Sequence, residues 1–328
     1  MLHKRKIFLR LTVLILIALF LFGCTSPVPN KSSRKIFDGF SVHYLDVGEG
    51  DAIFIHFPDG KNMLIDSGEK DEDLSKFIIG FLDDYGVEKI DYFVLTHPDS
   101  DHTGNAVDII DEFEIGTAYL PDMRIHINLY ESYSKVYNKI NEKQITVEYS
   151  DCFDHIIGQN YVVAFLSPNA LGTTNSSYTD FNATQSPSAT QSNAMSPIIY
   201  IEYSGVRFIF TGDAPISQET VALNNVKVFS EYYAELGVNL ENIDFLKVSH
   251  HGSNDASGND FLSVLKPKNA IISVGGDNIY GHPNVDVLAR LFNANQNYNL
   301  YRTDVHGTIS VEVDKNGNTK IITDKSIN

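Results

Sequence analysis

Cysteine and tryptophan are almost missing from this chain of 328 residues, which contains two cysteines and no tryptophan. The two cysteines, Cys24 and Cys152, are too few for a disulfide-rich scaffold or a cysteine-ligated zinc finger. Aromatic bulk comes instead from 17 tyrosines and 20 phenylalanines, within a hydrophobic content of 43%. That content excludes a disordered polyanion and suffices for the core of one large domain or two ordinary ones.

Basic residues are also scarce. The chain has 25 lysines and arginines against 42 aspartates and glutamates, which gives a formal charge of −17 at pH 7. A protein that coats nucleic acid needs clustered basic residues to neutralise phosphates, so the composition argues against such a protein. It does not argue against an enzyme that contacts phosphate groups through bound metal ions.

A long apolar run occurs only near the N-terminus. Residues 11–22 are apolar except for Thr12, and they follow four basic residues, Lys4, Arg5, Lys6 and Arg10. A basic start and a short apolar stretch predict a secretory signal peptide over residues 1–23. Because the small Gly23 precedes Cys24, the junction resembles the bacterial lipobox, in which the cysteine is lipidated and becomes the new N-terminus. A single transmembrane anchor is the alternative.

Either interpretation places the body of the chain outside the cytoplasmic membrane. A lipid on Cys24 would anchor an exported protein to the outer face of a bacterial membrane. Residues 24–38, rich in Ser, Pro, Asn and Lys, are expected to form a flexible tether, and residues 39–328 the folded domain. Removal of residues 1–23 would change the formal charge from −17 to −21, since that segment holds four basic residues and no acidic ones.

Strands and helices are expected to alternate through residues 39–328 in two roughly equal halves. Runs of β-branched and aromatic residues predict strands at 40–47, 52–57, 62–65, 92–95, 161–166, 198–203, 206–210, 245–248 and 270–274. Apolar spacing and composition predict helices at 73–85, 105–112, 129–141, 215–240, 260–265 and 285–292. A hairpin at 307–322 turns at Asn316-Gly317. The polar stretch 170–196 predicts a long loop, either a harmless insertion or a substrate lid.

The segment Thr96–His102 places two histidines and two aspartates, His97, Asp99, Asp101 and His102, directly after a predicted buried strand. Two carboxylates this close repel each other and raise each other's pKa, a penalty that a divalent cation removes. Imidazole nitrogen and carboxylate oxygen suit zinc or manganese, so the segment predicts a metal site. The alternative is a polar turn in which Asp99 or Asp101 caps the following helix.

Other predicted strands also end in ligand-type residues. Asp213 follows the strand at 206–210, and His250 and His251 follow the strand at 245–248. Asp51 and Asp66 stand in similar positions earlier in the chain. Because ligands are commonly presented beyond the carboxyl ends of strands, we expect these side chains to converge.

Taken together, the motifs resemble those of the metallo-β-lactamase fold hydrolases: His97-Pro-Asp-Ser-Asp-His102, Thr211-Gly-Asp213 and Lys247-Val-Ser-His-His-Gly-Ser253. More narrowly, the chain is similar over residues 40–315 to the soluble hydrolase domain of ComEC-type competence proteins. That similarity extends to Tyr44-Leu-Asp-Val-Gly-Glu-Gly-Asp51, Leu64-Ile-Asp-Ser-Gly68 and Tyr280-Gly-His-Pro283. The resemblance implies an α+β fold for residues 39–328, a four-layer αββα sandwich of two similar halves.

By position, the resemblance implies two divalent metal ions, zinc or manganese. His97, Asp99 and Asp213 would hold the first ion. The second would be held by Asp101, His102, Asp213 and His251, so that Asp213 bridges both. The third-motif histidine of the family has no clear counterpart, and Ser192-Asn193-Ala-Met-Ser196 stands in its place. The first metal site would therefore be rich in oxygen donors.

Three further residues are candidates for direct action on the substrate: His250, His282 and Asn193. Adjacent histidines point apart in an extended segment, so we expect His251 on the metal and His250 on the substrate. His282 is placed to donate a proton or to polarise an anionic oxygen, and a structural histidine in a turn is the alternative. Asn193 belongs to the Asn/Ser motif that replaces the missing histidine.

The resemblance implies hydrolysis by a metal-bridging hydroxide, and a phosphodiester is the expected substrate. The chain would be a nuclease acting on DNA or an envelope phosphodiesterase acting on a smaller ester. An ester or lactone hydrolase using the same ions and a non-catalytic surface binding module are the alternatives. Apart from the substrate and the membrane reached through Cys24, no partner is expected.

Overall fold

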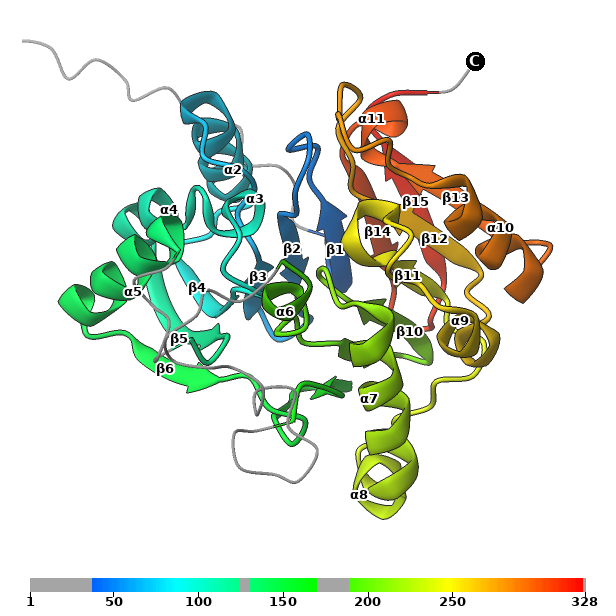
Figure 1. The fold of residues 1–328 in the computed structure, drawn as a ribbon. Coiled ribbons are helices and arrows are strands. Elements are labelled where there is room, and N and C mark those ends of the chain that lie inside the picture. The colour runs from blue at the N-terminus through cyan, green and yellow to red at the C-terminus, as the bar shows by residue number, and fades with distance from the viewer. Residues whose placement is uncertain (1–36, 124–129, 170–188, 327–328) are drawn as a thin grey trace, which may run out of the picture.

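The computed structural model describes residues 37–123, 130–169 and 189–326. In these residues two β-sheets face each other, and helices cover the outer face of each sheet (Figure 1). The expected four-layer αββα sandwich is therefore confirmed.

The first sheet has eight strands in the order β15-β14-β1-β2-β3-β4-β5-β6. Neighbours from β15 to β3 are antiparallel, and neighbours from β3 to β6 are parallel. The strands are β1 (Phe40–Tyr44), β2 (Ile53–His56), β3 (Asn62–Ile65), β4 (Lys89–Val94), β5 (Glu114–Leu120), β6 (Thr146–Tyr149), β14 (Ile309–Val313) and β15 (Thr319–Thr323).

The second sheet has seven strands in the order β13-β12-β11-β10-β9-β8-β7. It is parallel from β13 to β10 and antiparallel from β10 to β7, so each sheet has one parallel end and one antiparallel end. This shared pattern makes the two halves similar. The strands are β7 (His155–Ile157), β8 (Tyr161–Phe165), β9 (Ile199–Tyr203), β10 (Val206–Phe210), β11 (Phe245–Lys247), β12 (Asn269–Ile272) and β13 (Asn299–Arg302).

Alternating side chains on the strands divide the core into layers. On β10, Phe208 and Phe210 pack between the sheets, whereas Ile209 packs against the helices of the second half. Phe208 is fully buried and its ring centre lies 5.3 Å from that of Phe40 in the first sheet and 4.8 Å from that of Phe245. Aromatic contacts of this kind hold the two sheets in a fixed relative position.

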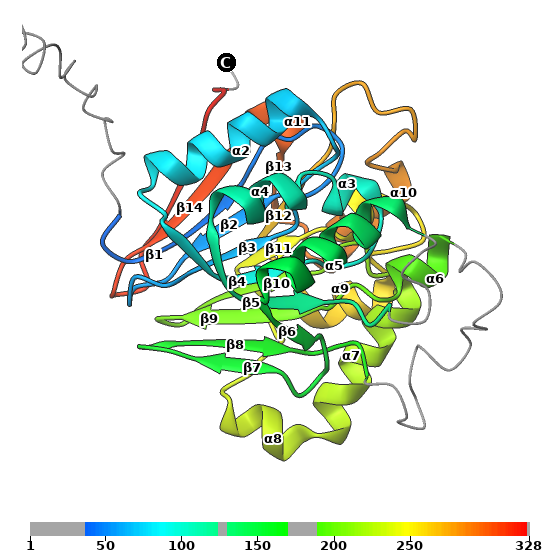
Figure 2. The ribbon, with the colours of Figure 1, turned by 90° about the vertical axis from the view of Figure 1, so that its left-hand side faces the viewer.

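Helices bury one apolar face each on the outer sides of the sheets. The first sheet is covered by α2 (Glu72–Asp84), α4 (Ala106–Glu112) and α5 (Glu131–Lys143), with α3 (Ser100–Thr103) at the carboxyl end of β4. The second sheet is covered by α7 (Ile216–Val228), α8 (Ser230–Glu235), α9 (Asn259–Leu265) and α10 (Val285–Ala294). Figure 2 shows α2 and α8 on opposite outer sides of the two sheets. Two short helices, α6 (Ala189–Asn193) and α11 (Thr303–His306), lie in connections.

Several sequence expectations need correction. The first strand ends at Tyr44 and not at residue 47, and the helix expected at 215–240 is two helices, α7 and α8. Four strands were not predicted, namely β5, β6, β7 and β13. Of these, β6, β7 and β13 have only three or four residues each and carry exposed polar side chains, so their apolar signal is weak.

The predicted signal peptide and Cys24 lie outside the described residues, as do residues 170–188 of the predicted polar loop. The described part of that predicted loop begins with the helix α6, residues 189–193. Within the described ranges, the structure contains no helix with the length and apolar character needed to cross a bilayer.

Candidate metal centre

Loops at the carboxyl ends of three strands bring their polar side chains together between the two halves. His97, Asp99, Asp101 and His102 follow β4 of the first sheet. Asp213 follows β10, and His250 and His251 lie in the 3₁₀ turn η2 (Ser249–Gly252) after β11, both in the second sheet. Each half of the fold therefore supplies part of one site, as the strand-end pattern predicts.

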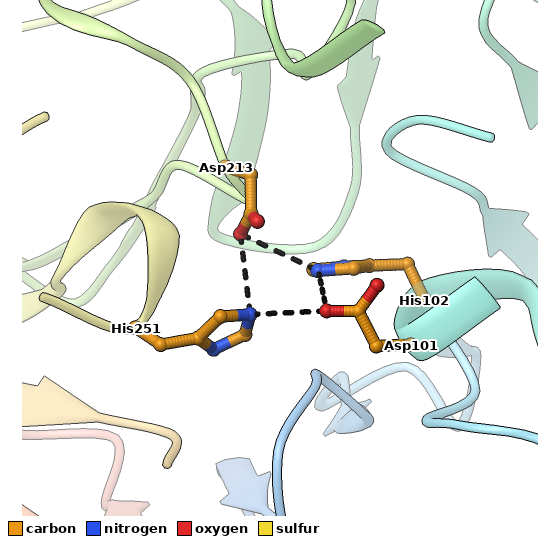
Figure 3. Close-up of side chains that lie close together, drawn as sticks. All are labelled: Asp101, His102, Asp213 and His251. Atoms are coloured by element: carbon orange, nitrogen blue, oxygen red, sulfur yellow. Dashed lines mark ion pairs between the residues drawn. The ribbon is translucent and has the colours of Figure 1, made fainter. Parts of the chain in front are cut away.

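Four of these side chains form a tight group, shown in Figure 3. Asp213 Oδ1 lies 3.4 Å from His102 Nε2 and 3.6 Å from His251 Nε2. Asp101 Oδ2 lies 3.6 Å from His102 Nε2 and 3.5 Å from His251 Nε2. Asp101, His102, Asp213 and His251 are the four residues that the resemblance assigns to the second metal ion.

The chemistry of this group fits a divalent cation. The buried Nε2 atoms of His102 and His251 and the Oδ1 atom of Asp213 have no hydrogen-bond partner among the described residues, and the same holds for Nε2 of the neighbouring His97. Buried polar atoms without a partner are costly unless a ligand satisfies them. Four donors placed about 2.1 Å from one centre in a tetrahedron lie roughly 3.4 Å apart, which matches the distances here.

A second, looser group surrounds the other oxygen of Asp213. Asp213 Oδ2 lies 3.9 Å from His97 Nε2, which in turn lies 3.7 Å from Asp99 Oδ2. His250 Nε2 lies 3.6 Å from the same Oδ2. The two oxygens of Asp213 thus face different sets of donors, the arrangement needed for a carboxylate that bridges two ions.

The expectation that His250 and His251 point apart rests on an extended backbone, and that premise is wrong. Both residues have left-handed backbone angles, with φ of 50° for His250 and 52° for His251. Such angles cost about 1–3 kcal/mol per non-glycine residue and cluster at functional sites. The turn directs both rings to Asp213, so the structure places His250 beside the first group of donors as well as beside the pocket.

The polar-turn alternative for residues 97–102 receives no support. Asp99 occupies the N-cap position of α3, but its side chain makes no capping hydrogen bond. Its carboxylate lies instead toward His97.

Hydrogen bonds at Nδ1 leave the Nε2 atoms of the histidines available. His102 Nδ1 lies 2.7 Å from Asp66 Oδ2, and His251 Nδ1 donates to the carbonyl of Ser273 at 2.9 Å. Thr96 Oγ1 donates to Asp66 Oδ2 at 2.7 Å and accepts from His97 Nδ1 at 3.0 Å. Partners of this kind fix the tautomer and ring orientation of metal-ligating histidines.

A buried ion pair supports this arrangement, and sequence reasoning assigned it no role. Lys247 and Asp51 are fully buried, with Lys247 Nζ 2.5 Å from Asp51 Oδ2 and 3.2 Å from the carbonyl oxygen of Gly212. Asp51 also lies 3.9 Å from His102 Nδ1. Asp51, Asp66 and His102 also bring ligand-type atoms within 4.8 Å of one another. We assign no cation to them, because the Lys247 ammonium already supplies the positive charge there. The signal in the sequence is a lysine inside the apolar strand β11.

Glycine is required where the β1–β2 loop meets the metal-binding loop. Gly50 has a φ of 113°, and a Cβ atom there would collide with the carbonyl oxygen of Asp101. The next residue, Asp51, donates its backbone N–H to the same carbonyl at 3.3 Å. This contact fixes Asp101 relative to the first sheet.

Electrostatics show how the site balances its charges without a cation. Burial and the neighbouring His102 lower the pKa of His97 to about 3, and burial and Asp101 raise the pKa of Asp99 to about 6. Burial opposes charge on His102, but Asp213, Asp101 and Asp66 raise its pKa well above the usual value. Protons on imidazole thus compensate the carboxylates, and a bound cation would replace them.

A pocket of about 290 Å³ opens above the donors. Its lining includes the three residues that the sequence indicated for action on the substrate, His250, His282 and Asn193. Asn193 Nδ2 lies 3.4 Å from His250 Nε2, and Asp255 Oδ1 lies 2.9 Å from His250 Nδ1. The pocket is also lined by five carboxylates, Glu49, Glu69, Asp99, Asp101 and Asp213, and by no lysine or arginine of the described chain.

A larger cleft of about 420 Å³ lies at the opposite ends of β4 and β5. Its charged residues pair with one another, as in Lys89–Glu114 at 3.1 Å and Lys143–Asp111 at 3.2 Å. Because these charges are already compensated at an exposed surface, we place the chemistry in the smaller pocket.

Comparisons with known proteins agree with this geometry. The sequence profile of the metallo-β-lactamase superfamily matches residues 45–137. The chain is 30% identical over 283 residues to ComE operon protein 3 of Bacillus subtilis strain 168, covering 82% of this chain and 32% of that protein. It is 26% identical over 255 residues to Recombination protein 2 of Haemophilus influenzae, covering 77% of this chain and 26% of that protein. The chain thus spans about a third or less of the length of these relatives.

A solved structure shares the fold. CmlA, a diiron β-hydroxylase from Streptomyces venezuelae, superimposes with a TM-score of 0.50 and 13% sequence identity. The match covers 84% of this chain and 54% of that one. At this identity the likeness concerns the fold alone.

The shared position of Asp213 predicts how cations bind. We expect two zinc or manganese ions per wild-type chain, about one in His251→Ala and fewer than one in Asp213→Ala, because Asp213 faces both groups of donors. Elemental analysis after gel filtration measures the ratio. His155→Ala, which changes an exposed histidine on β7, is the control and keeps two ions. Two ions retained in Asp213→Ala would contradict the assignment.

The Lys247–Asp51 pair predicts a double-mutant effect on stability. Lys247→Met leaves the Asp51 carboxylate buried without a counter-charge, so the free energy of unfolding should fall by about 3–5 kcal/mol. Adding Asp51→Asn removes that charge and should restore most of the loss. Urea denaturation in chelator measures both. A double variant as unstable as Lys247→Met would show that packing, and not charge, dominates.

Proposed function

Because this chain is a hydrolase of the metallo-β-lactamase superfamily with ComEC-type relatives, we propose that it is a dinuclear metal-dependent phosphodiesterase. The observation that carries the proposal is the carboxylate of Asp213, whose two oxygens face two separate sets of donors at the floor of a pocket. We propose His97, Asp99 and Asp213, with His250 beside them, for one ion, and Asp101, His102, Asp213 and His251 for the other.

When bound, two divalent cations would lower the pKa of a water and neutralise charge on the phosphoryl oxygens. The protein's own contribution is to orient the donors through Asp66, Thr96 and the Ser273 carbonyl. His250 and Asn193 line the pocket and are placed to contact an ester oxygen, and His282 is placed to deliver a proton. No side-chain nucleophile is required in this scheme.

The charge of the pocket favours a small phosphodiester over a nucleic acid. Five carboxylates line the pocket without a lysine or arginine of the described chain, and the whole chain has a formal charge of −17. Two divalent ions would balance the charge of Asp99, Asp101 and Asp213 and of a single phosphate. Glu49 and Glu69 would still repel the further phosphates of a polymer.

A nuclease acting on DNA is the second candidate, since one relative is named Recombination protein 2. An ester or lactone hydrolase would use the same donors. A non-catalytic binding module is disfavoured, because it would have no use for four buried donor atoms without partners.

We also propose that the chain is exported and anchored by a lipid on Cys24. This rests on the basic and apolar segments before Gly23-Cys24, with residues 24–38 as the tether to the domain at 39–328.

Activity on simple esters tests the proposed chemistry. With zinc or manganese, the purified chain should hydrolyse bis-p-nitrophenyl phosphate faster than it hydrolyses single-stranded DNA or the β-lactam nitrocefin. Asp213→Ala should lower the rate by about 1,000-fold or more, equivalent to about 4 kcal/mol, because both ions lose a ligand. The matched control His155→Ala should retain the wild-type rate.

Three results would change this conclusion. Full activity in Asp213→Ala would refute the assigned site, and faster cleavage of DNA would favour the nuclease. Cleavage of nitrocefin or a lactone without cleavage of the phosphodiester would favour the ester hydrolase.

Lipidation has its own test. Cells that express the full chain should incorporate labelled fatty acid into it and retain it in the membrane fraction. Cys24→Ala should remove the label, since the thiol is the acceptor. The matched control Cys152→Ala alters the buried cysteine and should leave labelling unchanged. Equal labelling of Cys24→Ala and the wild-type chain would exclude this anchor.

A further inference from the structure

A carboxylate from one half of the fold contacts a histidine from the other half at the pocket. Glu49 lies in the loop between β1 and β2, and His282 lies between β12 and α10, 233 residues further along the chain. Glu49 Oε1 is 3.3 Å from His282 Nδ1. Both side chains line the pocket and are largely shielded, with 18% and 13% of their surface exposed.

The Glu49 carboxylate is itself held in place. Its second oxygen, Oε2, accepts the backbone N–H of Gly275 at 2.9 Å. A Cβ atom on Gly275 would lie 2.9 Å from the backbone nitrogen of Glu49, so this close approach requires glycine. Glu49 therefore cannot move freely relative to the loop that carries His282.

The His282 ring is also restrained from several sides. Asn278 accepts the backbone N–H of His282 at 2.9 Å and donates to its carbonyl at 3.0 Å. The ring stacks on Tyr280 with an angle of 22° and a centre distance of 5.6 Å, and it meets His250 edge-on at 5.7 Å. With Nδ1 directed at Glu49, Nε2 is the nitrogen left for another partner.

We propose that Glu49 is a positioning residue that fixes His282 so that its Nε2 protonates the leaving group of the substrate. A carboxylate on Nδ1 selects the tautomer and orientation of an imidazole and stabilises its protonated form. Asp255 and His250 make a similar pair on the opposite side of the pocket, at 2.9 Å. Of these two histidines, His250 also pairs with Asp213 at 3.6 Å, whereas the ion pair of His282 is with Glu49, so we assign the proton transfer to His282.

A water oxygen forms a bond to phosphorus and releases one of its protons to solvent, and the bond from phosphorus to the leaving oxygen breaks. The electron pair of that bond goes to the leaving oxygen, which takes the proton from His282 Nε2. His282 becomes neutral, keeps its Nδ1–H on Glu49, and regains a proton from solvent. The inference rests on the proposed phosphodiesterase activity.

Leaving-group dependence tests the role, because a good leaving group needs no proton and a poor one does. The full chain, loaded with zinc or manganese, is assayed on methyl 4-nitrophenyl phosphate and on methyl phenyl phosphate. We expect His282→Ala to lose about 100-fold on the phenyl ester and less than about threefold on the nitrophenyl ester. Glu49→Gln should lose about tenfold or more on the phenyl ester alone, and the double variant should be no worse than His282→Ala.

Glu69→Gln is the matched control. Glu69 is another carboxylate of the pocket lining, and it accepts from Ser100 and has no contact with His282 among the described residues. Loss of the Glu69 charge in this control should change the rates of hydrolysis of both esters by the same factor. Glu49→Asp, which keeps the charge but shortens the side chain, should show the same selective loss as Glu49→Gln.

A second readout does not depend on activity. In ¹⁵N–¹H spectra of the metal-free chain, the Nδ1–H signal of His282 is identified as the one that is absent from the spectrum of His282→Ala. This signal should be visible in the wild type and absent in Glu49→Gln. If Glu49→Gln lost the same factor in rate on both esters, or if its Nδ1–H signal were unchanged, the positioning role would be overturned. A wild-type chain that cleaves neither ester would instead overturn the proposed function, and the positioning role with it.

Discussion

The Asp213 carboxylate is the point on which the site depends. It is almost fully buried, with 4% of its side chain exposed, and buried imidazole nitrogens face both of its oxygens. Burying a carboxylate is costly unless positive charge or hydrogen bonds compensate it. Here His251 and His102 hold the pKa of Asp213 well below its ordinary value although burial acts to raise it. The site is therefore built to hold negative charge at one place between the two sheets.

The distances around Asp213 are set by the packing of the two halves. Asp101 and His102 belong to the first sheet, whereas Asp213 and His251 belong to the second. A shift of the sheets by 1 Å would change the two separations that join the halves, His102–Asp213 at 3.4 Å and His251–Asp101 at 3.5 Å. The inter-sheet contacts of Phe208 and the buried Lys247–Asp51 pair oppose such a shift. Core packing thus acts as the support that a metal site needs to keep its geometry.

The sequence predicts the parts of this site that are local. Polar residues directly after apolar strands identify the segments around His97, Asp213 and His251, because the end of a strand is visible in the sequence. The sequence does not predict side-chain directions that depend on backbone geometry, or contacts between residues that lie far apart in the chain. The direction of the His250 ring follows from a left-handed turn, and only the structure reveals it. The partners Glu49 and His282 are separated by 233 residues, and no pattern in one segment indicates the other.

The same limit applies to the fold. Strands with strong apolar character, such as β10, are predicted with their ends correct, because they bury both faces. Short strands at the sheet edges have few residues and leave several of them exposed: β6 exposes Thr146 and Glu148, and β7 exposes His155 and Ile157. Their position is fixed by backbone pairing to a neighbour, which leaves little trace in composition.

The pocket's charge links metal and substrate. Its lining holds five carboxylates and, among the described residues, no lysine or arginine, so an anionic ester meets repulsion in the metal-free chain. Bound cations would convert that repulsion into attraction at the same atoms. By linkage, an anionic ester must then raise the affinity for cations by the factor by which cations raise the affinity for the ester. Loss of the cations would therefore weaken the binding of such an ester, and buried contacts that orient the donors would support both binding events.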